Sequence, residues 1–172
     1  MEKVARFEKI SLEQFEKDYL NSFPELSITN IQLMYKNIVV PKRATKGSAG
    51  YDLFAPFDII LKPGETIKVP TGIHVYIKEG WFLALFPRSG LGFKFRLQLN
   101  NTVGIIDSDY VQSDNEGHIY LRITNDSNEN KTLSVKQGEG LVQGIFLPFG
   151  ITEDDETDGI RNGGFGSTTK RD

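Results

Sequence analysis

Apolar and polar residues alternate with a period of two along most of the chain from Ile31 onward. The alternation is clearest at residues 73–77, 95–99 and 119–123, where every second residue is apolar. Glycine-containing turn sequences lie between such stretches: Lys62-Pro63-Gly64-Glu65, Lys78-Glu79-Gly80 and Lys136-Gln137-Gly138-Glu139. This pattern predicts an all-β sandwich or barrel, with at most a brief helix beyond residue 30.

The first thirty residues follow a different pattern. Ser11 and Gln14 have the spacing of a capping box, and Phe15 and Tyr19 lie on one face of the helix that would follow. We therefore expect a short N-terminal helix that ends near Phe23.

The last twenty residues contain little apolar material to bury. An acidic run over residues 153–158 is followed by Gly159, Gly163, Gly164 and Gly166. The sequence thus predicts three parts: an N-terminal helical extension (1–30), a β domain (31–152) and a mobile C-terminal arm (153–172).

The composition excludes several classes of protein. With 172 residues, 38% of them apolar and 25% charged, the chain fits one globular domain without a membrane span. The N-terminal stretch is too charged for a signal peptide, so we expect a cytoplasmic protein. There is no cysteine and there are two histidines, so any metal would be a hard ion bound by oxygen. A net charge of −3 argues against a broad nucleic-acid-binding surface.

Two segments carry the donors that phosphate groups need. Arg88-Ser89-Gly90-Leu91-Gly92 follows an apolar strand, and Gly163-Gly164-Phe165-Gly166-Ser167-Thr168 lies between Arg161 and Lys170. Taken singly, the first fits a tight turn and the second a disordered tail. Together they favour a polyphosphate ligand, and neither is a Walker or dinucleotide-binding loop.

The segment between these cradles contains candidate catalytic carboxylates. On an extended strand Asp107 and Asp109 would point to the same face, where one could act as a general base; an acidic turn is equally compatible. Asn101 could read a pyrimidine edge, or it could be an ordinary turn residue. His74 and His118 fall on the polar faces of their strands and are interpreted as surface or packing residues.

Two further polar residues are candidates for phosphate chemistry. Asp52 could help to hold a hydrated magnesium ion on a polyphosphate, or it could be a turn aspartate. Gln143 interrupts an apolar strand, and it either faces solvent, which the pattern favours, or reaches a ligand.

Five segments, in this order, resemble the motifs of the trimeric dUTP diphosphatase (dUTPase) family, especially members from Gram-positive bacteria and their phages. They are Ala49-Gly50-Tyr51-Asp52-Leu53, Pro87-Arg88-Ser89-Gly90-Leu91, residues 101–110, Gly138-Glu139-Gly140-Leu141-Val142-Gln143, and residues 163–168. The resemblance implies a jelly-roll subunit in a homotrimer. It also implies three active sites at subunit boundaries, each closed by the C-terminal arm of a neighbour.

The resemblance implies an activity and a role for each site residue. dUTP would be hydrolysed to dUMP and pyrophosphate by water attack on the α-phosphorus, which limits uracil in DNA and supplies dUMP for thymidylate synthesis. Asp107 would be the base and Tyr110 would lie against the deoxyribose. The groups that would read uracil are Asn101 and the backbone around Gly104 and Ile106.

The same resemblance assigns the phosphate-binding groups. Those for the phosphate chain would be Arg88, Ser89, Gly90 and Gln143. Those from the arm would be Arg161, Gly166, Ser167 and Thr168, with Phe165 over the base. Asp52 would assist, through water, a Mg²⁺ ion bound mainly by the phosphates.

The chain departs from the family pattern in three places. Typical members have no N-terminal helix, the polar loop at residues 111–117 is long, and the arm is one residue shorter after Arg161. Two alternatives stay open. One is a dCTP deaminase-like enzyme on the same fold. The other is a nucleotide-responsive regulator that binds a protein partner through the arm, the loop or the N-terminal helix.

Overall fold

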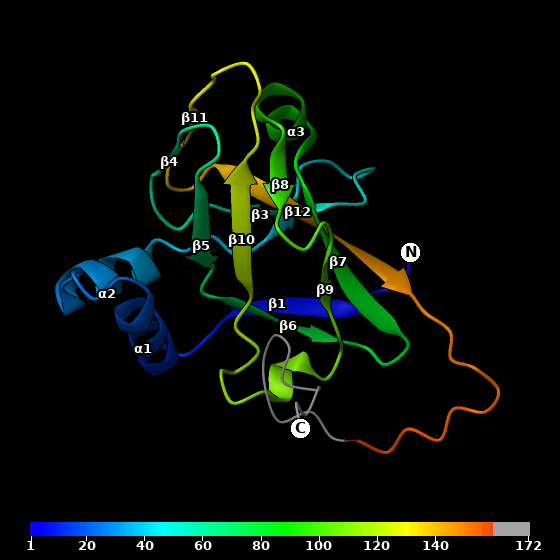
Figure 1. Ribbon diagram of the computed structural model, residues 1–172. Helices are drawn as coiled ribbons and strands as arrows, with labels where there is room; N and C mark the ends of the chain where they lie inside the picture. The colour runs from blue at the N-terminus through cyan, green and yellow to red at the C-terminus, as the bar shows by residue number, and fades with distance from the viewer. Residues whose placement is uncertain (160–172) are drawn as a thin grey trace, which may run out of the picture.

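A computed structural model describes residues 1–159 of the protein, and strands dominate this part of the chain (Figure 1). The strands are β1 (Ala5–Lys9), β2 (Lys42–Arg43), β3 (Tyr51–Phe54), β4 (Ile59–Leu61), β5 (Thr66–Pro70), β6 (Ile73–Ile77), β7 (Trp81–Pro87), β8 (Leu97–Leu99), β9 (Gly104–Ile106), β10 (Tyr120–Asn125), β11 (Leu133–Val135) and β12 (Gly140–Pro148). The helices are α1 (Leu12–Ser22), α2 (Ile28–Lys36), α3 (Ser89–Phe95) and the 3₁₀ helix η1 (Tyr110–Gln112). The predicted all-β, jelly-roll class is confirmed as a mostly β fold with short helices.

The strands pair antiparallel throughout the described residues. The largest sheet has the order β2-β3-β12-β7-β9, and a second has the order β5-β10-β8; β4 pairs with β11, and β1 pairs with β6. Alternate residues point inward and form one core, represented by Leu83, Leu121, Ile123 and Leu141, each at most 2% exposed. The turns predicted at residues 62–65, 78–80 and 136–139 all separate strands.

The N-terminal helix is present, and two unexpected elements flank it. Ser11 caps α1 by accepting a hydrogen bond from the Gln14 amide at 3.1 Å. β1 precedes the helix and pairs with β6, while α2 follows it and packs beside α1 (Figure 1). Ile31 lies inside α2, so the predicted alternation from Ile31 is wrong for residues 31–36. Ser27 caps α2 and starts the helix there.

The segment after β7 is helical, which the sequence analysis did not predict. Residues 89–95 form α3, so the strand predicted from Phe95 begins only at Leu97. Arg96 takes a left-handed conformation, φ 50°, between the two elements. The alternation of residues 95–99 could not reveal this switch, because its first residue belongs to the helix end.

His74 and His118 are packing residues, which is one of the two interpretations that the sequence left open. They are 7% and 0% exposed, although alternation placed both on polar strand faces. The N-terminal segment covers that side of the sheet, since β1 lies along β6 and Asp18 of α1 contacts His118. No helix within residues 1–159 is long and apolar enough to span a membrane.

Candidate active site

Two predicted phosphate-binding residues, Arg88 and Gln143, and the predicted magnesium residue Asp52 meet where β3, β7 and β12 adjoin. Asp52 and Gln143 are register partners on β3 and β12, and Arg88 directly follows β7. The Arg88 Nε lies 3.1 Å from the Asp52 Oδ1, and the Arg88 Nη1 donates to the Gly140 carbonyl at 3.1 Å. Gln143 donates from Nε2 to the Pro87 carbonyl at 3.3 Å. The sequence therefore folds distant segments into one polar cradle.

A cavity of about 340 Å³ opens over this cradle. It is lined by Ala44, Ser48, Ala49, Gly50, Asp52, Arg88, Ser89, Gln143 and Ile145. Gln143 faces this cavity and is half-buried, which fits the ligand-facing alternative rather than the solvent-facing one. The guanidinium, the carboxamide and the Ser89 hydroxyl form a donor set suited to phosphate oxygens.

Two glycines make the close approach of these side chains possible. A Cβ at Gly140 would lie 2.5 Å from the Arg88 Nη1, and a Cβ at Gly50 would lie 2.6 Å from the Gln143 Oε1. Any larger residue would displace one of the two side chains. The glycines of the first and fourth motifs thus set the position of Gln143 and Arg88.

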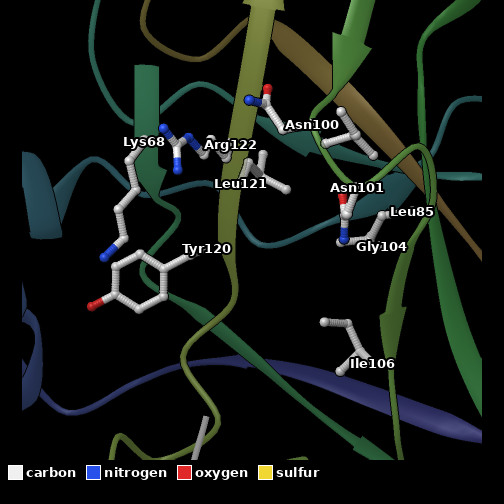
Figure 2. Close-up of a pocket in the computed structure, with 10 residues that line it drawn as sticks. Lys68, Leu85, Asn100, Asn101, Gly104, Ile106, Tyr120, Leu121 and Arg122 are labelled. Carbon is white, nitrogen blue, oxygen red and sulfur yellow. The ribbon is translucent and has the colours of Figure 1, made fainter. Parts of the chain in front are cut away.

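A second cavity, of about 460 Å³, contains the predicted base-reading residues. Figure 2 shows Asn101 and Gly104 next to each other, with Lys68 and Tyr120 on the opposite side. The remaining lining residues are Leu85, Leu99, Asn100, Ile106, Leu121 and Arg122. Apolar side chains with a few amides at the edge suit a flat, uncharged ring.

Gly104 has a steric role in this cavity. It faces Leu85 across the β7–β9 ladder, and a Cβ added to it would lie 3.1 Å from the Leu85 Cβ. The backbone of β9 therefore stays close to β7. Asn101 is exposed in the turn before β9, and its carbonyl accepts a hydrogen bond from Val103 at 2.7 Å.

Asp107 and Asp109 lie in a turn rather than on a strand. β9 ends at Ile106, and the Asp107 carbonyl accepts a hydrogen bond from the Tyr110 amide at 3.2 Å as the chain enters η1. Of the two arrangements that the sequence left open, the acidic turn is therefore the one found, and the two carboxylates do not project from a strand. Asp107 directly follows Ile106, which is one of the residues that line the second cavity.

Tyr110 is buried, with 3% of its surface exposed. Its hydroxyl donates to the His118 carbonyl at 3.0 Å, and Asn115 donates from Nδ2 to the Tyr110 hydroxyl at 3.2 Å. These hydrogen bonds fix the ring at the start of the loop formed by residues 110–118.

Three residues of the second cavity escaped sequence reasoning. Lys68 and Arg122 are register partners on β5 and β10, and the Lys68 Nζ lies 4.3 Å from the centroid of the Tyr120 ring. Their positions on the polar faces of two alternating strands were the available signal. Only the pairing of the strands shows that they share a cavity.

The described residues offer few side chains that could coordinate a metal ion. Within residues 1–159 no group of three histidine, aspartate or glutamate side chains could hold an ion. Asp52 is a single carboxylate, paired with Arg88. The predicted arm residues Arg161, Phe165, Gly166, Ser167 and Thr168 lie outside the described residues.

The part of the chain that contains both cavities is similar to a known protein family. Residues 36–169 match the family model described as dUTPase, so the match includes both cavities. The chain belongs to the dUTPase family. The predicted resemblance is confirmed, and the first 35 residues lie outside the dUTPase match.

Individual dUTPase relatives agree with this assignment. The deoxyuridine 5′-triphosphate nucleotidohydrolase of Lactococcus lactis is 42% identical over 139 residues, covering 78% of this chain and 91% of that protein. The enzyme of the same name from Neisseria meningitidis serogroup A is 44% identical over 138 residues, 76% and 87% of the two chains. The crystal structure of Streptococcus mutans dUTPase has a TM-score of 0.62 at 34% identity, covering 86% of this chain and 98% of that one.

Proposed function

We propose that the protein hydrolyses dUTP to dUMP and pyrophosphate, which limits uracil incorporation into DNA and supplies dUMP for thymidylate synthesis. The observation that carries this proposal is the dUTPase match over residues 36–169, which includes the cradle of Arg88 and Gln143. The named relatives are nucleotidohydrolases, which favours hydrolysis over deamination.

In the proposed reaction Asp107 is the general base. Its carboxylate takes a proton from a water molecule while the water oxygen forms a bond to the α-phosphorus. The bond from the α-phosphorus to the oxygen that bridges the α- and β-phosphates breaks, and pyrophosphate leaves with that oxygen. The proton on Asp107 then passes to solvent.

The second cavity is proposed to select the nucleoside. Asn101 and the backbone of Gly104 and Ile106, which line this cavity, supply polar contacts for uracil, and the shape of the bound pocket rejects the thymine methyl and the cytosine amino group. Tyr110 excludes a 2′-hydroxyl by lying against the deoxyribose.

The polar cradle is proposed to bind the triphosphate. Arg88, Ser89 and Gln143, which line the cavity, and Gly90, which follows Ser89, supply donors that fit its oxygens. The single carboxylate of Asp52 fits a Mg²⁺ ion bound mainly by the phosphates, because this ion keeps several waters and needs few protein carboxylates, so Asp52 would hold it through water. When bound, Mg²⁺ neutralises phosphate charge that the acidic chain could not offset alone.

We further propose a cytoplasmic homotrimer with active sites between subunits. The base-reading cavity and the phosphate cradle have no lining residue in common, which supports their joining across a subunit boundary. The arm of a neighbour would supply Arg161, Gly166, Ser167 and Thr168 for the phosphates and Phe165 for the base.

A nucleotide panel tests the proposed function. With Mg²⁺ present, pyrophosphate release from dUTP should exceed release from dTTP, dCTP and UTP by at least about a hundredfold. Comparable turnover of all four nucleotides would contradict the proposal, as would release of ammonia from dCTP.

A further inference from the structure

The N-terminal segment is hydrogen-bonded to the loop that carries Tyr110. Ser11, the N-cap of α1, donates from its amide to the Glu116 Oε2 at 2.8 Å and from its hydroxyl to the Glu116 Oε1 at 2.5 Å. Both oxygens of one carboxylate are thus held by a residue 105 positions away in the sequence. The same hydroxyl caps α1, so the helix start and the loop are fixed together.

A second, buried link joins α1 to the end of this loop. The Asp18 Oδ2 lies 2.6 Å from the His118 Nδ1, and the His118 Nε2 accepts a hydrogen bond from the Gly72 amide at 2.8 Å. Because Nε2 is an acceptor, the ring is neutral and its proton sits on Nδ1, donated to Asp18. Burial lowers the pKa of His118 and outweighs the opposing effect of Asp18, which agrees with a neutral ring.

The loop needs such support because its backbone is strained. Glu116 and Gly117 both take positive φ angles, 57° and 69°. A left-handed conformation is unfavourable for glutamate. The Glu116 carbonyl also lies 2.8 Å from the His74 Nδ1, so both ends of this residue are bound. These three contacts, two with Ser11 and one with His74, offset the strain.

The supported loop in turn fixes Tyr110. The tyrosine hydroxyl donates to the carbonyl of His118, the residue that Asp18 holds from the other side. Gly117 turns back so tightly that a Cβ on it would lie 2.8 Å from the Tyr110 carbonyl oxygen. A continuous series of hydrogen bonds therefore runs from α1 to the ring proposed to lie against the sugar.

We propose that Ser11 and Asp18 are positioning residues for substrate selection, which hold Tyr110 through the loop of residues 110–118 and so maintain the preference for deoxyribose over ribose. This role rests on the proposed function. Both residues precede residue 36, where the dUTPase match begins, so the family pattern does not assign it to them. If the loop relaxes, the ring moves and space for a 2′-hydroxyl opens.

Two variants break the two links separately. Glu116→Ala removes the acceptors of Ser11 and leaves the α1 cap and the backbone requirement at position 116 unchanged. Asp18→Ala leaves the His118 Nδ1 proton without an acceptor, whereas Asp18→Asn retains one. Ser27→Ala is the matched control, because it removes the cap of α2, which bonds to the Asn30 amide and not to the loop.

Two readouts are needed for each variant. The first is the ratio of kcat/KM for dUTP to that for UTP, which a general loss of stability does not change. The second is amide hydrogen exchange of residues 110–118 in the free protein, which is independent of activity.

Glu116→Ala and Asp18→Ala should each lower the kcat/KM ratio by about tenfold, chiefly through KM, and speed exchange in the loop. Asp18→Asn and Ser27→Ala should stay near wild type in both readouts. An unchanged ratio in Glu116→Ala, or an equal fall in Ser27→Ala, would overturn the positioning role. A wild-type protein that does not hydrolyse dUTP contradicts the proposed function instead, and the exchange data then still test the links.

Discussion

The Arg88 guanidinium contacts the Asp52 carboxylate and the Gly140 carbonyl. It can lie this close to the backbone because Gly140 has no side chain. The residue types of this cradle were predictable, because arginine, glutamine and glycine each stand in a recognisable segment. Their mutual positions were not, because they depend on the pairing of β3, β7 and β12. The contact between His118 and Asp18 was not predictable for the same reason, since the two residues lie 100 positions apart.

Gly50→Ala tests the steric part of the cradle. The new Cβ would meet the terminal amide of the Gln143 side chain, which can move aside. Stability should therefore change little, while the KM for dUTP rises by about tenfold. Thermal unfolding and steady-state kinetics measure the two effects. Gly47→Ala is the control, because a Cβ there meets nothing within 4 Å. Equal kinetics in both variants would contradict the role of Gly50.

Asp107→Asn tests the proposed base. The amide keeps the size of the side chain but accepts no proton, so turnover should fall by about a hundredfold or more while the affinity for a non-hydrolysable dUTP analogue persists. Rapid-quench kinetics and calorimetric titration measure these quantities. Undiminished turnover would assign the base to another residue.

At the scale of elements, local sequence signals predicted some helices and strands, whereas others depend on tertiary contacts that the sequence does not reveal. The α1 start was predictable from Ser11 and Gln14, because a cap is a local interaction. α2 was missed because Ile31 was assigned to the alternating pattern, and η1 because Asp107 and Asp109 fit a strand as well as a turn. β1 gave no decisive signal of its own, and its pairing with β6 is a long-range contact.

The link between α1 and the β domain predicts how stability depends on pH. Burial lowers the folded-state pKa of His118 below its ordinary value of 6.5, so the unfolded chain binds this proton more readily. The stabilisation is complete above about pH 6.5 and is lost as the pH falls toward the folded-state pKa. The slope cannot exceed about 1.4 kcal/mol per pH unit for one proton.

Denaturant unfolding between about pH 7.5 and about pH 5 measures this effect. His118→Gln is the comparison, because its carboxamide can accept from Gly72 and donate to Asp18 without titrating. The variant should lose less stability on acidification than the wild type. An equal loss would show that another group titrates.

At the scale of the whole molecule, the fold class was predictable from alternation and turns, whereas the proposed homotrimer rests on the resemblance to the family alone. Several apolar side chains are exposed, among them Phe93 with 90% and Ile60 with 64% of the residue surface accessible. Their neighbouring sequence does not indicate whether another subunit contacts them. The two cavities, one lined by Arg88 and the other by Ile106, have no lining residue in common, and their proposed joining across subunits could not be predicted from local sequence.

Complementation between inactive variants tests the shared sites. Arg88→Ala and Asp107→Asn should each be inactive alone. When the two are co-expressed as mixed trimers, a site with both native residues should form in about a quarter of cases if the residues come from different subunits. Pyrophosphate release by the purified mixture, with its mass from analytical ultracentrifugation, measures the recovery. No recovery in verified mixed trimers would place each site within one subunit.

β1 has a consequence for the solubility of the chain. Within residues 1–159, β6 has β1 as its ladder partner, so these few N-terminal residues cover one row of backbone donors and acceptors on β6. Proteolytic trimming before Ile10 would leave that row open to any extended strand nearby. The amino terminus therefore shields the molecule from edge-to-edge aggregation, and a cut there should appear first as turbidity rather than as lost catalysis.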